Sequence, residues 1–297
     1  MNLQEKLAAD NVEKGVSGII LFFAGLAPTL KTGFLTQMPE LAGSENVYGE
    51  KQMKLDVWAD SVIVEKLKES KLVKSIYTEE QPEVIQVPDG ADYCVAIDPM
   101  DGSSNIKTNM AMGAIVGVYS GSDVLSKGED LKASFYILFG PITTLVITWG
   151  KGVHEFVLDS KEFKLRFENI KLPEDPKVYS PGGRRGKWLP GFEKFIAELE
   201  AKGMKLRNNG SMVGDTNTIL KYGGVFTYPA QTDKPNGKLR VLCECNPLGF
   251  LIEQAGGYAS NGKESVLGVK PENTDQRTPI YMGNKELVKR LEEYLEG

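Results

Sequence analysis

Apolar residues recur every three or four positions in two stretches near the start of the chain, which is the spacing of one face of an α-helix. The clearer stretch is residues 50–70, where Asp, Glu and Lys separate the apolar positions Leu55, Val57, Trp58, Val62, Ile63 and Leu67. We therefore predict helices over residues 3–33 and 50–70. Pro39 and Gly43 predict a loop between them, over residues 38–48.

Short runs rich in β-branched and aromatic residues follow the second helix and are typical of strands. They cover residues 93–97, 112–119, 133–138, 143–148 and 154–158. Residues 171–177 contain two prolines and read as a linker. Beyond it, predicted helices alternate with strands: helices at 188–202, 247–255 and 285–295, strands at 224–228 and 239–243. The pattern predicts an α/β protein in layers of helix and sheet, with halves at residues 1–174 and 175–297.

The composition is that of a globular protein with a substantial core, since 41% of the 297 residues are hydrophobic and 25% are charged. A formal net charge of −5 argues against a nucleic-acid partner. The apolar stretch at residues 16–28 is too short to span a bilayer, so we expect a buried helix and no membrane partner. No signal peptide precedes Cys94, Cys243 and Cys245, and we expect reduced thiols in a cytoplasmic protein.

One turn carries a strong indication of chemistry. The apolar run 93–97 leads into Asp98-Pro99-Met100-Asp101-Gly102-Ser103-Ser104, where Pro99 and Gly102 are expected to end the strand. Two carboxylates then lie at the C-terminal edge of a strand, where α/β enzymes place their sites. Carboxylate oxygens suit Mg²⁺, and the Gly-Ser-Ser segment can offer N–H and hydroxyl groups to a phosphate. The pattern favours phosphate-ester hydrolysis, and taken alone it also fits an ordinary turn with a helix N-cap.

Further acidic residues stand out along the chain. Asp56 and Asp60 share a predicted helix, and Glu79-Glu80 follow the β-like run 74–78. Glu244 is the least expected, because it lies between two cysteines at the end of an otherwise apolar run. A buried carboxylate needs a partner, and the residues alone leave a metal ion and a basic side chain equally open.

Several motifs together resemble class I fructose-1,6-bisphosphatases in order and spacing. They are Lys54-Leu55-Asp56-Val57, Thr78-Glu79-Glu80, the 98–106 segment, Gly210-Ser211-Met212-Val213, Lys238-Leu239-Arg240, Glu244-Cys245-Asn246-Pro247 and Gln276-Arg277. The match runs from about residue 48 to the C-terminus, although inositol monophosphatases share the Asp-Pro-x-Asp-Gly-Ser core. The resemblance implies a five-layer αβαβα sandwich, a metal-binding first half, a substrate-binding second half and a homotetramer.

The resemblance also implies roles in the metal site. Glu79, Asp98, Asp101 and Glu244, with the carbonyl of Met100, would hold two or three Mg²⁺ ions, for which Mn²⁺ can substitute. These ions would polarise the 1-phosphate of a sugar bisphosphate and activate a water. Glu80, with Asp56 or Asp60, would take the proton of that water, and the spacing of the two aspartates is more like that of sedoheptulose-1,7-bisphosphatases.

Substrate-binding roles follow in the same way. Gly102, Ser103 and Ser104 would hold the phosphate that is lost. Arg207, Tyr228 and Lys238 would hold the 6-phosphate, and Gly210, Ser211 and Met212 would line the sugar pocket. Fructose 1,6-bisphosphate is the expected substrate, with fructose 6-phosphate and phosphate as products.

Two departures from the family bear on substrate choice. Asn208 stands where these enzymes usually carry a tyrosine, and Pro181-Gly182-Gly183 replaces another pocket segment. Sedoheptulose 1,7-bisphosphate therefore stays an alternative or additional substrate. An inositol-type monophosphatase and a catalytically inactive protein are the remaining alternatives. At the family's AMP site the usual lysine before Tyr93 is replaced by Asp92, so we expect weak AMP inhibition.

Overall fold

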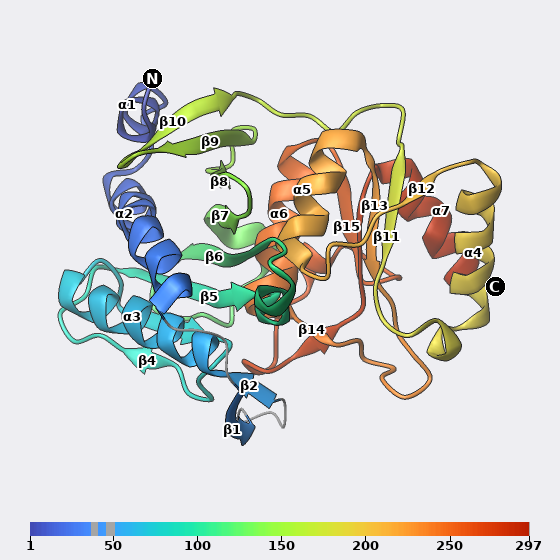
Figure 1. Ribbon diagram of the computed structural model, residues 1–297, viewed down its shortest axis with the longest axis horizontal. Helices are drawn as coiled ribbons and strands as arrows, with labels where there is room; N and C mark the ends of the chain where they lie inside the picture. The colour runs from blue at the N-terminus through green and yellow to red at the C-terminus, as the bar shows by residue number, and fades with distance from the viewer. Residues whose placement is uncertain (37–40, 46–50, 297) are drawn as a thin grey trace.

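The computed structural model describes residues 1–36, 41–45 and 51–296, with side chains described for residues 1–34 and 55–296. Two large β-sheets alternate with three groups of helices (Figure 1). Helices α2 (Lys14–Thr36) and α3 (Lys54–Ser70) cover one face of the first sheet. Helices α5 (Met212–Tyr222) and α6 (Asn246–Gln254) lie between the sheets, and α4 (Pro190–Ala201) with α7 (Lys285–Glu296) covers the far face. The expected αβαβα layering is confirmed.

The first sheet has eight strands in the order β10-β9-β8-β7-β6-β5-β3-β4. Its strands are β3 (Ser75–Thr78), β4 (Ile85–Gln86), β5 (Tyr93–Asp101), β6 (Met112–Ser120), β7 (Leu131–Phe139), β8 (Thr143–Thr148), β9 (His154–Asp159) and β10 (Glu162–Phe167). The central strands are buried along almost their whole length, since helices cover both faces. All five predicted strands are present, and β10 was missed although Phe163, Leu165 and Phe167 alternate with polar residues in the pattern of a half-buried strand.

Strand β5 differs from expectation in a way that matters for the site. It does not end before Pro99 but continues to Asp101, with a register shift against β6 between Asp98 and Asp101. Proline is tolerated in a strand at such an irregularity, where no ladder hydrogen bond is needed from its nitrogen. The distortion carries both aspartates to one end of the sheet.

The N-terminal helix predicted over residues 3–33 is two helices. α1 (Leu3–Ala9) ends at Asp10, because Asn11 adopts a φ of 53° and the Val12 amide donates back to the Leu7 carbonyl. By length and composition alone, the 14–34 span of α2 is long enough to cross a membrane, a test that the buried core helix of a globular protein also passes. Its burial is confirmed: the side chains that enter the core are Val16, Ile19, Ile20, Phe23, Leu26, Ala27 and Leu30.

The predicted loop at residues 38–48 is corrected in part. Residues 41–45 form strand β1 (Leu41–Glu45), which pairs antiparallel with β2 (Lys51–Met53). The rest of that predicted loop lies outside the described residues. Helix α3 accordingly begins at Lys54 rather than at residue 50.

The second sheet has five strands in the order β12-β11-β13-β17-β15. They are β11 (Val178–Pro181), β12 (Lys205–Leu206), β13 (Gly224–Tyr228), β15 (Tyr258–Ser260) and β17 (Ile280–Gly283). A separate ladder joins β14 (Leu239–Arg240) to β16 (Arg277–Thr278). The strand predicted at 239–243 is therefore wrong beyond Arg240: Val241–Cys245 form a π-helical turn that runs directly into α6. An apolar run this short does not distinguish a buried strand from a buried helical turn.

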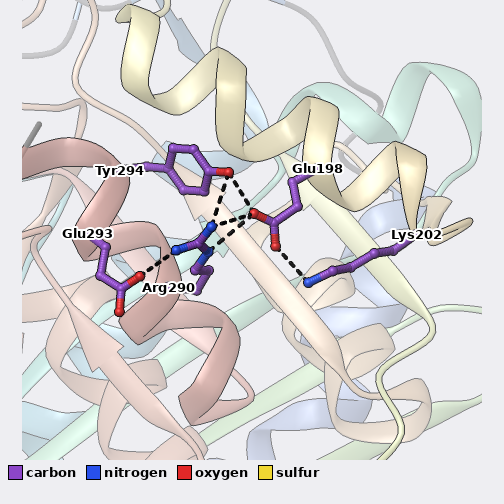
Figure 2. A network of polar contacts seen from close by, with 5 residues as sticks. All are labelled: Glu198, Lys202, Arg290, Glu293 and Tyr294. Atoms are coloured by element: carbon purple, nitrogen blue, oxygen red, sulfur yellow. Dashed lines mark hydrogen bonds and ion pairs between the residues drawn. The ribbon is translucent and has the colours of Figure 1, made fainter.

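Helices α4 and α7 are tied together by a polar network on the outer layer (Figure 2). The Glu198 carboxylate accepts from Tyr294 Oη at 2.6 Å, from Arg290 Nε at 3.2 Å and from Lys202 Nζ at 2.6 Å. Arg290 also reaches Glu293 at 2.6 Å. The hydrogen bond from Lys202, then that from Tyr294, lowers the Glu198 pKa to about 2.

Candidate active site

A cavity of about 620 Å³ opens where the end of β5 faces the start of α5, strand β13 and the turn after β14. Its lining comes from segments more than 180 residues apart in sequence, from Asp56 to Glu244. Both halves of the chain therefore contribute walls to one cavity.

Four acidic side chains predicted as metal ligands meet in this cavity, together with Met100: Glu79, Asp98, Asp101 and Glu244. Asp98 and Asp101 are held by backbone N–H groups. Met100 N donates to Asp98 Oδ1 at 2.9 Å, and the first amides of α5, at Met212 and Val213, donate to Asp101 at 3.1 and 2.8 Å. The N-terminus of α5 thus fixes the orientation of Asp101.

The carboxylates perturb one another because they are buried side by side. Burial, reinforced by the charges of Glu79, Asp101 and Glu244, raises the pKa of Asp98 well above its usual range. Burial likewise raises the pKa of Asp101 to about 7 and that of Glu244 to about 8. Ionising all of them in the bare protein is costly, and cations bound among them would remove that cost.

Arg240 provides a positive charge beside this cluster. Its side chain is 1% exposed, and Nη1 pairs with Glu79 while its backbone N–H donates to Glu244 at 2.6 Å. On its other side, Nε lies 3.3 Å from Asp275 Oδ1. Arg240 is thus the basic residue beside Glu244, but only its backbone N–H donates to that carboxylate. Its guanidinium pairs with Glu79 instead.

Cys243 also approaches the acidic cluster, which the sequence did not predict. Its sulfur and the carboxylate oxygens of Glu79 and Glu244 lie within 4.8 Å of one another. Burial, then the charges of Glu79 and Glu244, raises the pKa of this thiol well above its usual value, and sulfur is not a ligand that hard divalent cations prefer. All three cysteines are buried and free, as expected.

The two candidate aspartates of α3 are separated by the structure. Asp56 lines the cavity, as does Glu80. Asp60, one turn further along, is buried away from the lining and accepts from Gln81 Nε2 at 2.6 Å. Burial raises the Asp60 pKa as well. Only Asp56 of the pair is placed to meet a ligand directly.

The predicted phosphate segment directly follows Asp101 and lines the same cavity as the acidic cluster. Gly102, Ser103 and Ser104 all line the cavity, and a short 3₁₀-helix begins at Ser103. Gly102 has a φ of 75°, and a Cβ there would overlap the side chain of Ser211. Glycine is therefore required by both the backbone and the close approach of the α5 N-terminus.

The sugar-pocket residues are placed together with one exception. Gly210, Ser211, Met212, Tyr228 and Lys238 line the cavity, and Lys238 Nζ lies 5.9 Å from the centre of the Tyr228 ring. Arg207 does not line it: this exposed side chain borders a separate cavity of about 420 Å³ and donates to the Leu206 carbonyl. Arg207 therefore lies apart from Tyr228 and Lys238, the other residues predicted to hold the 6-phosphate.

Sequence reasoning missed several lining residues. Lys234 adds a second cation, and Phe226 and Asp215 add an apolar and an acidic surface. The sequence around Lys234, residues 233–237, is typical of a turn directly before Lys238, and this was the one sequence feature that could have indicated that Lys234 also reaches the cavity. Asn208 and Gly182, which marked departures from the family, do line the cavity.

The donor set fits hard divalent cations. Carboxylate and carbonyl oxygens are the preferred ligands of Mg²⁺ and Mn²⁺, and several are gathered here within one buried cluster. The raised pKa values show that the cluster lacks enough positive charge of its own.

Comparisons with known proteins agree along the whole chain. Residues 3–167 match the family model for the fructose-1,6-bisphosphatase N-terminal domain, and residues 172–296 match that for the C-terminal domain. The class 1 fructose-1,6-bisphosphatase of Geotalea uraniireducens is 45% identical over 299 residues, covering 99% of this chain and 96% of the relative. That of Methanocorpusculum labreanum is 43% identical, covering 98% and 90%.

Solved structures give the same result. The holo form of Leishmania major fructose-1,6-bisphosphatase superimposes with a TM-score of 0.94 at 30% identity, covering 100% of this chain and 99% of the other. The apo form gives a TM-score of 0.89. The chain belongs to the class 1 fructose-1,6-bisphosphatase family.

Proposed function

We propose that this protein hydrolyses the 1-phosphate of fructose 1,6-bisphosphate, giving fructose 6-phosphate and inorganic phosphate. The observation that carries the proposal is the single cavity whose lining combines the carboxylates of Glu79, Asp98, Asp101 and Glu244, the Gly102–Ser104 phosphate segment, and Lys238 with Tyr228. A bisphosphate needs a hydrolytic centre and an anchor for its second phosphate, and this cavity offers both. The full-length relatives support the same substrate.

Glu79, Asp98, Asp101 and Glu244, with the Met100 carbonyl, would hold two or three Mg²⁺ ions. When bound, divalent cations supply charge that polarises the phosphate and makes a water more acidic. Glu80 and Asp56 also line the cavity but are not among the proposed metal ligands. We assign to them the role of accepting the proton from the attacking water. Asp60 is left out of this assignment, because it does not line the cavity and accepts from Gln81 instead.

The phosphate that leaves is held by the N–H and hydroxyl groups of Gly102, Ser103 and Ser104. Lys238 holds the 6-phosphate, and Gly210 to Met212 line the sugar. Fixing the far phosphate restricts the orientation of the ester at the acidic cluster, which converts binding energy into positioning.

The test is phosphate release with and without Mg²⁺ from fructose 1,6-bisphosphate, sedoheptulose 1,7-bisphosphate and fructose 1-phosphate. We expect a requirement for Mg²⁺ or Mn²⁺ and a preference for the six-carbon bisphosphate. A ratio of kcat/KM above about a hundred in favour of the seven-carbon substrate would reverse the assignment, since one carbon rarely allows more.

The anchor has its own test. Lys238→Ala should raise KM for the bisphosphate about tenfold, because a charge-assisted pair contributes about 1.5–3 kcal/mol, and should leave fructose 1-phosphate almost unaffected. Lys270→Ala, an exposed lysine outside this cavity, is the matched control. Equal losses on both substrates would contradict the anchoring role.

We further propose a cytoplasmic homotetramer, on the basis of the family resemblance. Arg207 lines a different cavity, so within a single chain it does not contact the predicted site of the 6-phosphate. Light scattering of the purified protein tests the tetramer.

A further inference from the structure

A second cavity, of about 420 Å³, lies behind the β14–β16 ladder and has no part in the proposed reaction. Its lining is rich in amides and carries the cations Lys263 and Arg277, against one acidic side chain, Glu272. Cavities of this volume are large enough for small metabolites.

Two of its amides have their orientation fixed by the protein. Asn261 Oδ1 accepts from the backbone N–H groups of Lys263 and Glu264 at 2.9 and 3.0 Å. Gln276 Oε1 accepts from Glu272 N at 2.7 Å. Because an N–H must meet an oxygen, each amide is left with its NH₂ group as the remaining hydrogen-bonding end.

The wall is therefore mostly a set of donors, with Glu272 as its one carboxylate. Lys263 contributes ammonium protons, Arg277 a guanidinium, and Asn261 and Gln276 their NH₂ groups. A tetrahedral dianion accepts several hydrogen bonds from such a mixture of cations and neutral donors. A neutral sugar would instead call for a balance of donors and acceptors.

This cavity is joined to the acidic cluster through Asp275. Its Oδ1 lies 3.5 Å from Arg277 Nη2 and 3.3 Å from Arg240 Nε. Arg240 in turn pairs with Glu79 in the first cavity. Arg277 and Arg240 are also opposite one another in the ladder, and Arg277 Nη1 donates to the Lys238 carbonyl at 3.1 Å.

We propose that the second cavity is an effector site for a small phosphate ester, and that its occupancy tightens Mg²⁺ binding at Glu79. A phosphate that engages Arg277 competes with Asp275 for that guanidinium. Asp275 then pairs more fully with Arg240, which weakens the hold of Arg240 on Glu79 and lets a cation take its place. Linkage requires that Mg²⁺ tighten the phosphate ester by the same factor. The binding part of this proposal does not depend on the proposed activity.

Isothermal titration with sulfate, a tetrahedral dianion that cannot be hydrolysed, tests the site. The background is Lys238→Ala in chelator, which weakens binding in the first cavity. Asn261→Asp and Gln276→Glu keep the oxygen that accepts the backbone hydrogen bonds and replace the NH₂ group with a negatively charged oxygen. Because that oxygen repels the anion, each variant should weaken saturable sulfate binding at least tenfold. Lys270→Ala controls for surface charge, and succinate replaces sulfate to separate carboxylates from tetrahedral anions.

The coupling is measured in Lys238→Ala without chelator, as the Mg²⁺ dissociation constant from thermal shifts with and without sulfate. We expect a decrease of threefold or more, and none in Asp275→Asn, which retains sulfate binding. Sulfate binding that survives both isosteric variants, or a preference for succinate, would overturn the site. Sulfate binding without any change in Mg²⁺ affinity would overturn the coupling.

Discussion

Asp98→Asn should make the metal-free protein more stable while destroying its activity. Asp98 is 4% exposed, and its pKa is raised first by burial and then by Glu79, Asp101 and Glu244. Asparagine keeps the oxygen that accepts from Met100 N and removes the charge. The variant thus relieves repulsion without breaking the local hydrogen bond.

The magnitude follows from the neighbouring carboxylates. The pKa of Asp98 is raised first by its own burial and then by the charges of Glu79, Asp101 and Glu244, and the substitution removes both unfavourable contributions. Each pKa unit of such a rise corresponds to about 1.36 kcal/mol. We therefore expect a gain of about 1–3 kcal/mol in chelator, or a rise in Tm of about 2–6 °C.

The gain depends on pH with a definite sign. A carboxyl group whose pKa is higher in the folded than in the unfolded protein lowers the free energy of unfolding as pH rises between those two pKa values. The unfolded pKa is near 4, and the folded pKa is about 7 for Asp101 and about 8 for Glu244. The advantage of Asp98→Asn should therefore be larger at pH 8.5 than at pH 5.

Differential scanning fluorimetry with chelator and with excess Mg²⁺ provides the assay. Wild type should gain about 2.7 kcal/mol at a hundredfold excess over the dissociation constant, and the variant less, so Mg²⁺ should narrow or reverse the difference between the two Tm values. Turnover of Asp98→Asn should fall at least about a hundredfold.

Glu155→Gln is the matched control. Glu155 is 1% exposed but is paired with Lys221 at 2.5 Å and Arg166 at 3.3 Å. Its loss should lower Tm in both conditions and leave the Mg²⁺ shift unchanged. If Asp98→Asn lowered Tm in chelator as Glu155→Gln does, or kept the full Mg²⁺ shift, the reasoning would be refuted.

Three further predictions concern other parts of the chain. Gly102→Ala should reduce kcat/KM at least tenfold with unchanged circular dichroism, because its Cβ would displace Ser211, and wild-type kinetics would disprove the close approach. Glu198→Gln should cost about 1 kcal/mol at pH 7 and much less near pH 2, since a group whose folded pKa is lowered to about 2 contributes stability above its unfolded pKa and loses it as pH falls through the folded value; urea unfolding at the two pH values checks this. AMP should inhibit only at millimolar concentration, because the Tyr93 hydroxyl is already bonded to Glu13, and half-inhibition by micromolar AMP that Tyr93→Phe abolished would be the contrary result.

The local chemistry was accessible from the sequence because it is written in short contiguous segments. The order Asp98 to Ser104 delivers two carboxylates and a phosphate segment from one strand end, and the structure keeps them in one cavity. Hydrophobic periodicity also placed the central strands and helices α3, α4, α6 and α7, since burial of one face demands that spacing. It did not find α5, whose first amides hold Asp101, and it passed over β10 although apolar and polar residues alternate along that strand.

Long-range packing decided what the segments could not. Asp56 and Asp60 lie one helical turn apart and look equivalent in sequence, yet only Asp56 faces the cavity, because α3 packs with Asp60 turned toward Gln81. The environment of Glu244 likewise depended on the π-helical turn after Arg240 and on the pairing of Arg240 with Glu79. The raised pKa values of the cluster arise only when residues far apart in sequence are buried together, and that proximity is a property of the folded chain.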